Sequence, residues 1–272
     1  MKRSICIIFC LAAVLSASHP SFAGNGEEDG RKTIIQSFRP IYMVSGIPVD
    51  GTPVNSSSAD VKFQISFMLP VFSNIGGVEG LDIKIGYTQK SVWFLYAPSS
   101  PFKDNTYIPG LYLTLPLANT DGSLLCGIEH RSNGRDDNLS RSVNYAFGEY
   151  SHAFRCGLTL SANARIGFGW YGDDRTQDIF NKFYGYATLG AMYERGRFSA
   201  LISATPTFGP FHISHTAEIS FRPWNNSLYH LFVQYHHGYD ECFSDCIYGN
   251  IPGHNLRFGI LITPSGVRRL SR

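Results

Sequence analysis

Beyond its first two dozen residues the chain has no run of 18 apolar residues, which excludes a membrane-spanning helix. It also has no excess charge of either sign. There are 23 basic and 21 acidic side chains, and two of the basic ones, Lys2 and Arg3, lie in the N-terminal segment, so the rest is formally neutral. This balance implies no nucleic-acid partner and no partner with an acidic surface.

Cysteine is scarce, with six in the whole chain, two of them near the N-terminus. Cys242 and Cys246 share a short loop segment, and they are compatible with a disulfide in an oxidising compartment or with free thiols. Cys126 and Cys156 have no evident partner. The cysteines therefore leave the pairing open.

Residues 1–23 have the parts of a secretory signal peptide: a basic start, an apolar run from Ile5 to Leu15, and the small-x-small end Ser21-Phe22-Ala23. We therefore expect export and cleavage after Ala23. Residues 24–37 are expected to form a mobile leader, because most of them are polar or charged. Residues 38–272 are expected to form one domain.

Aromatic residues make up 14% of the chain, and polar and apolar residues alternate over long stretches. Alternation with a period of 2 predicts strands that have one apolar face. The segment from Leu158 to Trp170 is long enough for a tilted strand to cross a bilayer. Twelve strands are predicted, at residues 38–45, 61–69, 81–95, 111–117, around 130, 142–154, 158–170, 184–193, 198–205, 212–222, 228–237 and 255–263.

The predicted connections alternate between short turns and long loops. This alternation, an even number of strands and a signal peptide are typical of an antiparallel transmembrane β-barrel of a bacterial outer membrane. Closure is required, since lipid cannot satisfy the open edge of a sheet. The alternative is a secreted β-sandwich, which the apolar face on nearly every strand disfavours.

The most informative stretch is Gly127 to Arg135, with its answering segment Leu139 to Asn144. On a strand, His130 and Ser132 share one face, as a base and a hydroxyl nucleophile require. That face also carries Ile128, so the pair points toward lipid. Asn144 can orient the imidazole if the returning strand pairs it with His130.

Other histidines, a second His-x-Ser segment and one glutamine are alternative candidates for functional residues. His212 and Ser214 repeat the His-x-Ser spacing, but they share a polar face and are interpreted as lumen groups. His236 and His237 lie on opposite strand faces, a poor geometry for one metal ion. Gln89 lies between Tyr87 and Trp93 on an apolar face, where an amide needs a partner, and a second subunit can supply one.

The segments His130-Arg131-Ser132-Asn133-Gly134-Arg135 and Leu139-Ser140-Arg141-Ser142-Val143-Asn144 resemble the signature of the outer membrane phospholipase A family. Three further segments resemble that family in the same order, namely 87–93, 99–102 and 238–239. The similarity extends from about Val61 to Ile262. It implies a twelve-stranded barrel that hydrolyses phospholipid acyl esters and is active as a calcium-bound homodimer.

The resemblance also implies residue roles. Ser132 is the expected nucleophile, His130 the general base, Asn144 the orienting amide and Gly134 the oxyanion donor through its N–H. Calcium is expected to take the Arg135 carbonyl, the Ser140 hydroxyl, Ser99 from the partner subunit and the Asp174 carboxylate, with Asp137 as a rival for the last role. Gln89 matches a polar residue of the dimer interface.

Together these residues predict a calcium-dependent phospholipase of A1/A2 type in the outer membrane. Asn144 cannot offset the charge of an imidazolium as a carboxylate does, so a hard cation beside the oxyanion is expected to supply that stabilisation. The competing hypothesis is a passive porin or structural barrel in which His130 and Ser132 are incidental. The chain ends in a basic tail, residues 265–272, to which we assign no role.

Overall fold

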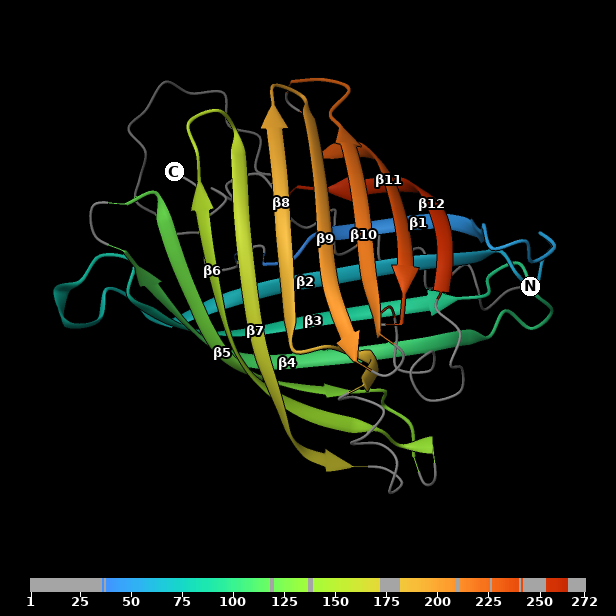
Figure 1. Cartoon of the computed structure of the whole chain (residues 1–272), viewed down its shortest axis with the longest axis horizontal. Coiled ribbons are helices and arrows are strands. Elements are labelled where there is room, and N and C mark those ends of the chain that lie inside the picture. The colour runs from blue at the N-terminus through green and yellow to red at the C-terminus, as the bar shows by residue number, and fades with distance from the viewer. Residues whose placement is uncertain are drawn as a thin grey trace, which may run out of the picture. The chain divides into compact units, whose positions relative to one another are not determined.

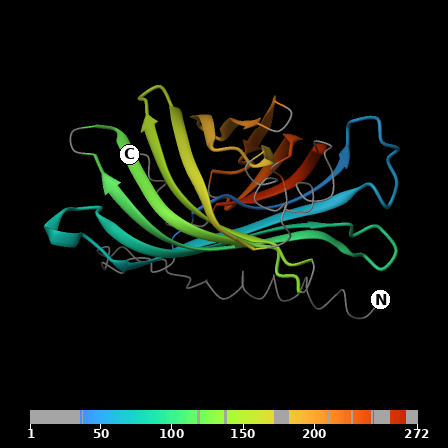
Figure 2. The same cartoon turned by 60° about the horizontal axis from the view of Figure 1, so that its bottom comes forward.

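The computed structural model describes residues 36, 38–117, 120–136, 139–171, 182–208, 211–225, 227–239, 241 and 253–263. Twelve antiparallel strands form a closed barrel in which each strand pairs with its neighbours in sequence and β1 pairs with β12 (Figures 1 and 2). The strands are β1 (Ile41–Pro48), β2 (Asp60–Phe72), β3 (Asp82–Trp93), β4 (Phe102–Pro116), β5 (Gly122–Ser132), β6 (Ser142–Ala153), β7 (Leu158–Tyr171), β8 (Ala187–Arg195), β9 (Phe198–Phe208), β10 (Phe211–Phe221), β11 (Tyr229–Gly238) and β12 (Gly253–Ile262).

The twelve-stranded transmembrane barrel predicted from the alternation is confirmed. No helix in the described ranges is long and apolar enough to cross a membrane. Several predicted boundaries were wrong by three residues or more, among them both ends of β1 and the starts of β4 and β8. β4 begins at Phe102, not at Leu111, because its first half points polar side chains such as Asp104 and Thr106 inward, where the apolar pattern does not reveal a strand. Tyr184 lies before β8, which begins at Ala187.

The barrel has an apolar outside and a polar inside, the reverse of a soluble core. Large exposed apolar side chains recur on the outer face of nearly every strand, among them Ile85, Leu111, Ile166, Leu189, Ile202, Ile219, Leu231 and Phe258. Buried polar side chains alternate with them and point inward, among them Lys62, Gln64, Thr88, Glu129, Thr207, Gln234 and Arg257. This distribution fits a wall that faces lipid.

One part of the interior is filled by a network of charged side chains. Arg257 Nε and Nη2 donate to both carboxylate oxygens of Asp60, at 2.8 and 2.7 Å, and Arg257 Nη1 donates to Glu241 Oε1 at 2.6 Å. Lys62 Nζ donates to the same Glu241 oxygen and to Gln234 Oε1, both at 2.9 Å. Arg257 and Gln234 are almost entirely buried. The network links β2, β11, β12 and the residue Glu241 that follows β11.

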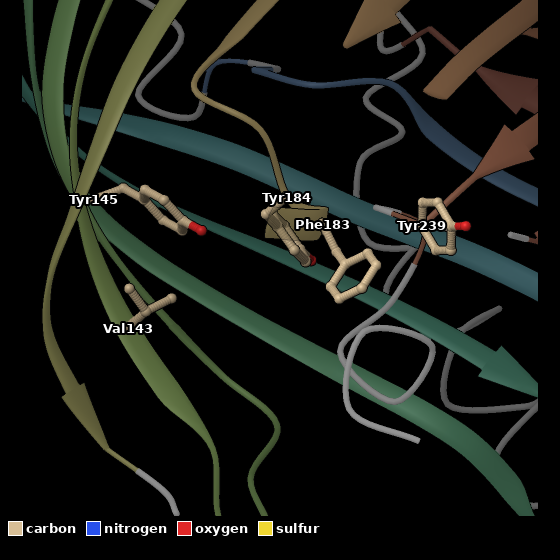
Figure 3. Close-up of a cluster of buried hydrophobic side chains, with 5 residues drawn as sticks. All are labelled: Val143, Tyr145, Phe183, Tyr184 and Tyr239. Atoms are coloured by element: carbon tan, nitrogen blue, oxygen red, sulfur yellow. The ribbon is translucent and has the colours of Figure 1, made fainter. Parts of the chain in front are cut away.

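A second part of the interior is aromatic. Val143 and Tyr145 of β6 meet Phe183 and Tyr184, which precede β8, and Tyr239, which follows β11 (Figure 3). The rings of Tyr145 and Tyr184 stack with centroids 6.3 Å apart. The charged network and this cluster occupy separate parts of the interior, and a largely polar cavity of about 350 Å³ remains beside Tyr145 and Tyr184.

The chain just before β1 enters the barrel. Gln36 exchanges two backbone hydrogen bonds with Met68 of β2, at 2.8 and 2.7 Å. Arg39 then places its guanidinium on Glu129 of β5, and its backbone N–H donates to the Ser66 hydroxyl at 3.1 Å. Residues 1–35, and with them the expected signal peptide and most of the expected leader, lie outside the described residues, as do Cys242, Cys246 and the basic tail.

We predict that Glu241→Gln destabilises the barrel most strongly near neutral pH. Burial alone would raise the pKa of Glu241, but Arg257 and Lys62 hold that pKa well below its ordinary range. A lowered carboxyl pKa gives stability that is present above about pH 4.3 and is lost as pH falls through the native pKa. Breaking a buried ion pair from one side costs about 3–5 kcal/mol.

The measurement is urea unfolding of the detergent-solubilised barrel between pH 3 and pH 8. Wild type should lose stability as the pH falls below about 4, and Glu241→Gln should show a smaller change over that window. Glu79→Gln is the matched control, because Glu79 is an exposed carboxylate in the β2–β3 connection. Equal pH dependence in wild type and Glu241→Gln would contradict the assignment.

Candidate functional site

The pairing of β5 with β6 sets the candidate site. Its register places His130 directly opposite Asn144, and the His130 Nδ1 lies 2.9 Å from the Asn144 Oδ1. An amide oxygen only accepts, so Nδ1 carries the proton and Nε2 is left as the acceptor, which is the basic nitrogen. The predicted contact between His130 and Asn144 is therefore present in the structure.

A β-bulge in β7 holds the Asn144 amide in this orientation. The register between β6 and β7 shifts between Ser142 and Asn144, and Gly169 of β7 adopts a φ of 60°. The Asn144 Nδ2 donates to the Gly169 carbonyl at 3.4 Å, which leaves Oδ1 for the imidazole. A Cβ at position 169 would lie 2.7 Å from that Nδ2, so any larger residue there would displace the Asn144 amide. Sequence reasoning missed the role of Gly169, because a bulge interrupts the alternation of period 2 and leaves no recognisable pattern of its own.

His130 and Ser132 face outward, as predicted. Ile128, on the same face, is 52% exposed, whereas Glu129 between them is fully buried. Glu129 accepts hydrogen bonds from Arg131 at 2.9 Å and from the Tyr112 hydroxyl at 3.1 Å, besides the Arg39 contact. These hydrogen bonds fix the inward direction of Glu129, and the alternation along β5 therefore directs His130 and Ser132 toward lipid.

Ser132 follows His130 on the outward face and is half-buried. Within the described part of the chain, the Ser132 hydroxyl makes no hydrogen bond to the imidazole. Nucleophile–base contacts are often loose in structures without substrate. The structure thus brings Ser132 and His130 to adjacent outward positions of one strand without joining them.

The loop between β5 and β6 carries Gly134, Arg135 and Ser140. Gly134 has a φ of 63°, and a Cβ there would lie 2.4 Å from the Tyr107 ring, so glycine is required on both counts. Gly134 and Arg135 are exposed and Ser140 is half-buried. The Gly134 N–H meets no acceptor among the described residues, so it is free to serve as a donor.

The β3–β4 loop presents Ser99. Ser99 and Ser100 adopt φ values of 62° and 43°, an uncommon conformation for residues other than glycine. The loop is held by the Trp93 indole N–H, which donates to the Ser100 carbonyl at 2.8 Å. Ser99 itself is exposed. Asp174 and Asp137, the two candidate carboxylate ligands, lie outside the described residues.

The donors that the described residues offer are carbonyl and hydroxyl oxygens, which are ligands that Ca²⁺ accepts. Among the described residues, no group of three or more His, Cys, Asp or Glu side chains is disposed to bind a metal. Main-chain carbonyls and hydroxyls are not among these four kinds of side chain. Oxygen donors of these two kinds suit a hard cation such as calcium better than a metal that prefers nitrogen or sulfur.

Gln89 lies half-buried on the outer face of β3. The sequence interpretation assumed that its amide has no partner within the chain, and this was wrong. The amide accepts from the Tyr87 hydroxyl at 3.1 Å and donates to the Ser91 hydroxyl at 3.2 Å. Each end of an amide has capacity for a second hydrogen bond. A partner subunit can therefore still bond to Gln89, although its amide does not depend on one.

His236, His237 and the serine of the second His-x-Ser segment lie where the sequence interpretation placed them. Ser214 is buried inside the barrel, where its hydroxyl accepts the Tyr239 N–H at 3.1 Å. The His236 Nδ1 lies 2.9 Å from the Thr216 hydroxyl and its side chain is buried, whereas His237 is half-buried on the opposite face. The second His-x-Ser segment is thus part of the lumen wall.

The fold and site define a transmembrane β-barrel whose lipid-facing wall carries a hydrogen-bonded histidine and asparagine beside a serine. The model of the phospholipase A1 family matches residues 39–260. The chain belongs to this family.

Its relatives agree with this assignment. The phospholipase A1 of Proteus vulgaris is 31% identical over 160 residues, 55% of this chain and 52% of that protein, so the match spans about half the relative's length. Outer membrane phospholipase A from Escherichia coli has a TM-score of 0.71 at 22% identity, over 85% of this chain and 99% of that one. A Salmonella typhi outer membrane phospholipase dimer with bound calcium also gives 0.71 at 22%, over 88% and 94%. These two structures share the fold.

We predict that Gly169→Ala disturbs the His130–Asn144 pair more than it disturbs the barrel. Alanine at a φ near 60° costs about 1 kcal/mol, and the new methyl displaces the flexible Asn144 amide. Gly196→Ala is the matched control, because Gly196 has a φ of 59° with open space around its Cβ position. Both variants should lose similar stability in urea.

Imidazole ¹⁵N NMR separates the two variants. Wild type and Gly196→Ala should show His130 in the single tautomer with a protonated Nδ1, and Gly169→Ala should show mixed tautomers. An unchanged His130 spectrum in Gly169→Ala would contradict the role of the bulge.

Proposed function

We propose that the protein is a calcium-dependent phospholipase of the outer membrane that hydrolyses acyl ester bonds of phospholipids, of A1/A2 type. The observation that carries the proposal is the His130–Asn144 hydrogen bond on the outward face of β5 and β6, with Ser132 beside it. A hydrolytic site on the lipid-facing wall suits a substrate that is itself a membrane lipid. The family supports the same reaction.

The residues present can perform a serine hydrolase reaction. His130 Nε2 takes the Ser132 proton while Asn144 Oδ1 holds Nδ1–H, and the Ser132 oxygen attacks the ester carbonyl. The Gly134 N–H donates to the resulting oxyanion. His130 then returns the proton to the leaving lysophospholipid oxygen, and a water activated by His130 releases the fatty acid from Ser132.

The proposed calcium ligands are the Arg135 carbonyl and the Ser140 hydroxyl of one subunit, Ser99 of the other, and Asp174 or Asp137. The cation supplies positive charge beside the oxyanion, which a neutral Asn144 cannot provide. The β5–β6 loop supports this assignment, because Gly134 and Arg135 are adjacent and both exposed.

The porin alternative requires an open lumen. The interior of this barrel holds the Arg257–Asp60–Glu241–Lys62 network, and Arg257 and Glu241 are almost entirely buried. This network takes up part of the lumen, beside a cavity of about 350 Å³ that is lined largely by polar side chains. The paired charges therefore favour the enzyme over a wide aqueous channel.

A homodimer completes the proposal. His130 and Ser132 project outward near the long-loop end, and Ser99 lies in a separate exposed loop, between β3 and β4. A two-fold contact through the outer face of β3 would let the two Gln89 amides bond to each other with their remaining donor and acceptor capacity. Calcium held between two subunits then binds only the dimer, so calcium and self-association favour each other.

We expect purified, refolded protein to release fatty acid from a diacylphospholipid in mixed micelles when calcium is present. Ser132→Ala should lower turnover by about 10³-fold or more, as for other serine hydrolases without their nucleophile. Ser214→Ala is the matched control, since it removes the serine of the second His-x-Ser segment. Full turnover in excess chelator would remove calcium from the mechanism, and full turnover by Ser132→Ala would remove the triad.

The dimer is tested by Gln89→Ala. The variant should keep the barrel fold, lower activity at a low protein-to-detergent ratio, and recover it as protein concentration rises, because mass action restores the dimer. Chemical cross-linking against calcium concentration provides the second measurement. Full specific activity from calcium-loaded monomer would show that the dimer is not needed.

A further inference from the structure

We propose that Asn133 is a positioning residue: its side-chain amide takes the place of a main-chain carbonyl in the β5–β6 ladder and thereby sets the loop that presents the Gly134 N–H. This inference rests on the proposed function, because it concerns the oxyanion donor of the same site. In the sequence, Asn133 is notable only as a member of the segment from His130 to Arg135.

Three hydrogen bonds converge on this one buried amide. Asn133 Oδ1 accepts the Arg141 N–H at 3.0 Å and the Arg135 N–H at 3.3 Å. Asn133 Nδ2 donates to the Leu139 carbonyl at 2.8 Å. The side chain of Asn133 is buried, with 7% of the residue exposed. It therefore joins both ends of the loop between β5 and β6.

The arrangement departs from an ordinary ladder in one respect. In a hydrogen-bonded antiparallel pair, two opposite residues exchange both N–H···O bonds. Here the Asn133 N–H donates to the Arg141 carbonyl at 3.1 Å, but the Arg141 N–H goes to the Asn133 side chain. The peptide group between Asn133 and Gly134 is thus released from the ladder.

That release allows the next residue to turn. Gly134 adopts a φ of 63° against the Tyr107 ring, and its N–H belongs to the peptide group that has left the ladder. Asn133 thus compensates the lost ladder bond and leaves the Gly134 N–H without an acceptor in the described part of the chain. Fixing that donor before substrate arrives is what an oxyanion site requires.

Few other side chains can do this. Aspartate keeps both accepting positions but loses the donor to Leu139 and sets a charge against that carbonyl. Alanine leaves the Arg135 and Arg141 N–H groups and the Leu139 carbonyl without their partner. We therefore expect Asn133→Asp to retain part of the function and Asn133→Ala to lose most of it.

The chain contains a matched control. Asn55 organises the β1–β2 loop in the same manner: its Oδ1 accepts the N–H groups of Ser57 and Ser58, and its Nδ2 donates to the Pro53 carbonyl at 3.3 Å. Asn55 is exposed and lies in a different loop. Asn55→Ala removes an equivalent set of loop bonds and should leave turnover unchanged.

The experiment compares wild type, Asn133→Ala, Asn133→Asp, Asn55→Ala and Ser132→Ala, each as full-length refolded barrel in micelles with calcium. Turnover of a diacylphospholipid gives kcat and KM, and hydrogen–deuterium exchange of the peptide spanning residues 133–141 reports the loop without activity. Asn133→Ala should lower kcat about 10-fold to 100-fold, less than the loss of an oxyanion donor itself, with KM changed less than about 2-fold. Its loop amides should exchange faster, and Asn133→Asp should recover part of kcat.

Wild-type kcat in Asn133→Ala would overturn the inference, as would a loss of kcat matched by an equal loss of folded barrel on unheated gels. Equal losses of kcat in Asn133→Ala and Asn55→Ala would also overturn it. If instead wild type and Ser132→Ala show the same turnover, the proposed function itself has failed, whatever the loop exchange shows.

Discussion

The site depends on a constraint within one strand: Glu129 must face inward. It is fully buried between Arg39, Arg131 and Tyr112, and removing an ionised carboxylate from such partners is costly. Because side chains alternate along a strand, burying Glu129 forces the residues on either side of it outward. A one-residue slip would bury His130 and expose Glu129 to lipid. The burial of Glu129 in the polar interior thus determines that His130 reaches the outer face of the barrel.

The same interior supports the wall. Charged side chains from β2 and β12, and from the residue after β11, pair with one another inside the barrel, and an aromatic cluster lies beside β6. The charged pairs join strands that are near one another around the wall, and the aromatic cluster connects β6 to the residue after β11, which lies farther around it. They give the wall rigid support, which a site built from short hydrogen bonds needs.

The sequence predicted the twelve strands, the outward face of His130 and the contact of His130 with Asn144, because all three follow from a period of 2 and from antiparallel pairing. It did not predict the bulge at Gly169, which inserts a residue into the period, nor the first half of β4, whose inward residues are polar. It missed the role of Asn133, because a side chain that replaces a ladder bond leaves no pattern in the sequence. It also treated Gln89 as unpaired, since contacts with Tyr87 and Ser91 along one strand face require rotamers that alternation does not specify.

The central claim is that Ser132 is a nucleophile that works at the lipid-facing wall. The most direct measurement is covalent labelling of the folded barrel with a long-chain alkyl sulfonyl fluoride in the presence of calcium, read by peptide mass spectrometry. The account predicts a single sulfonylated serine, Ser132, with labelling lost in His130→Ala and in heat-unfolded protein. Unmodified Ser132, or equal labelling of Ser214 and other serines, would contradict it.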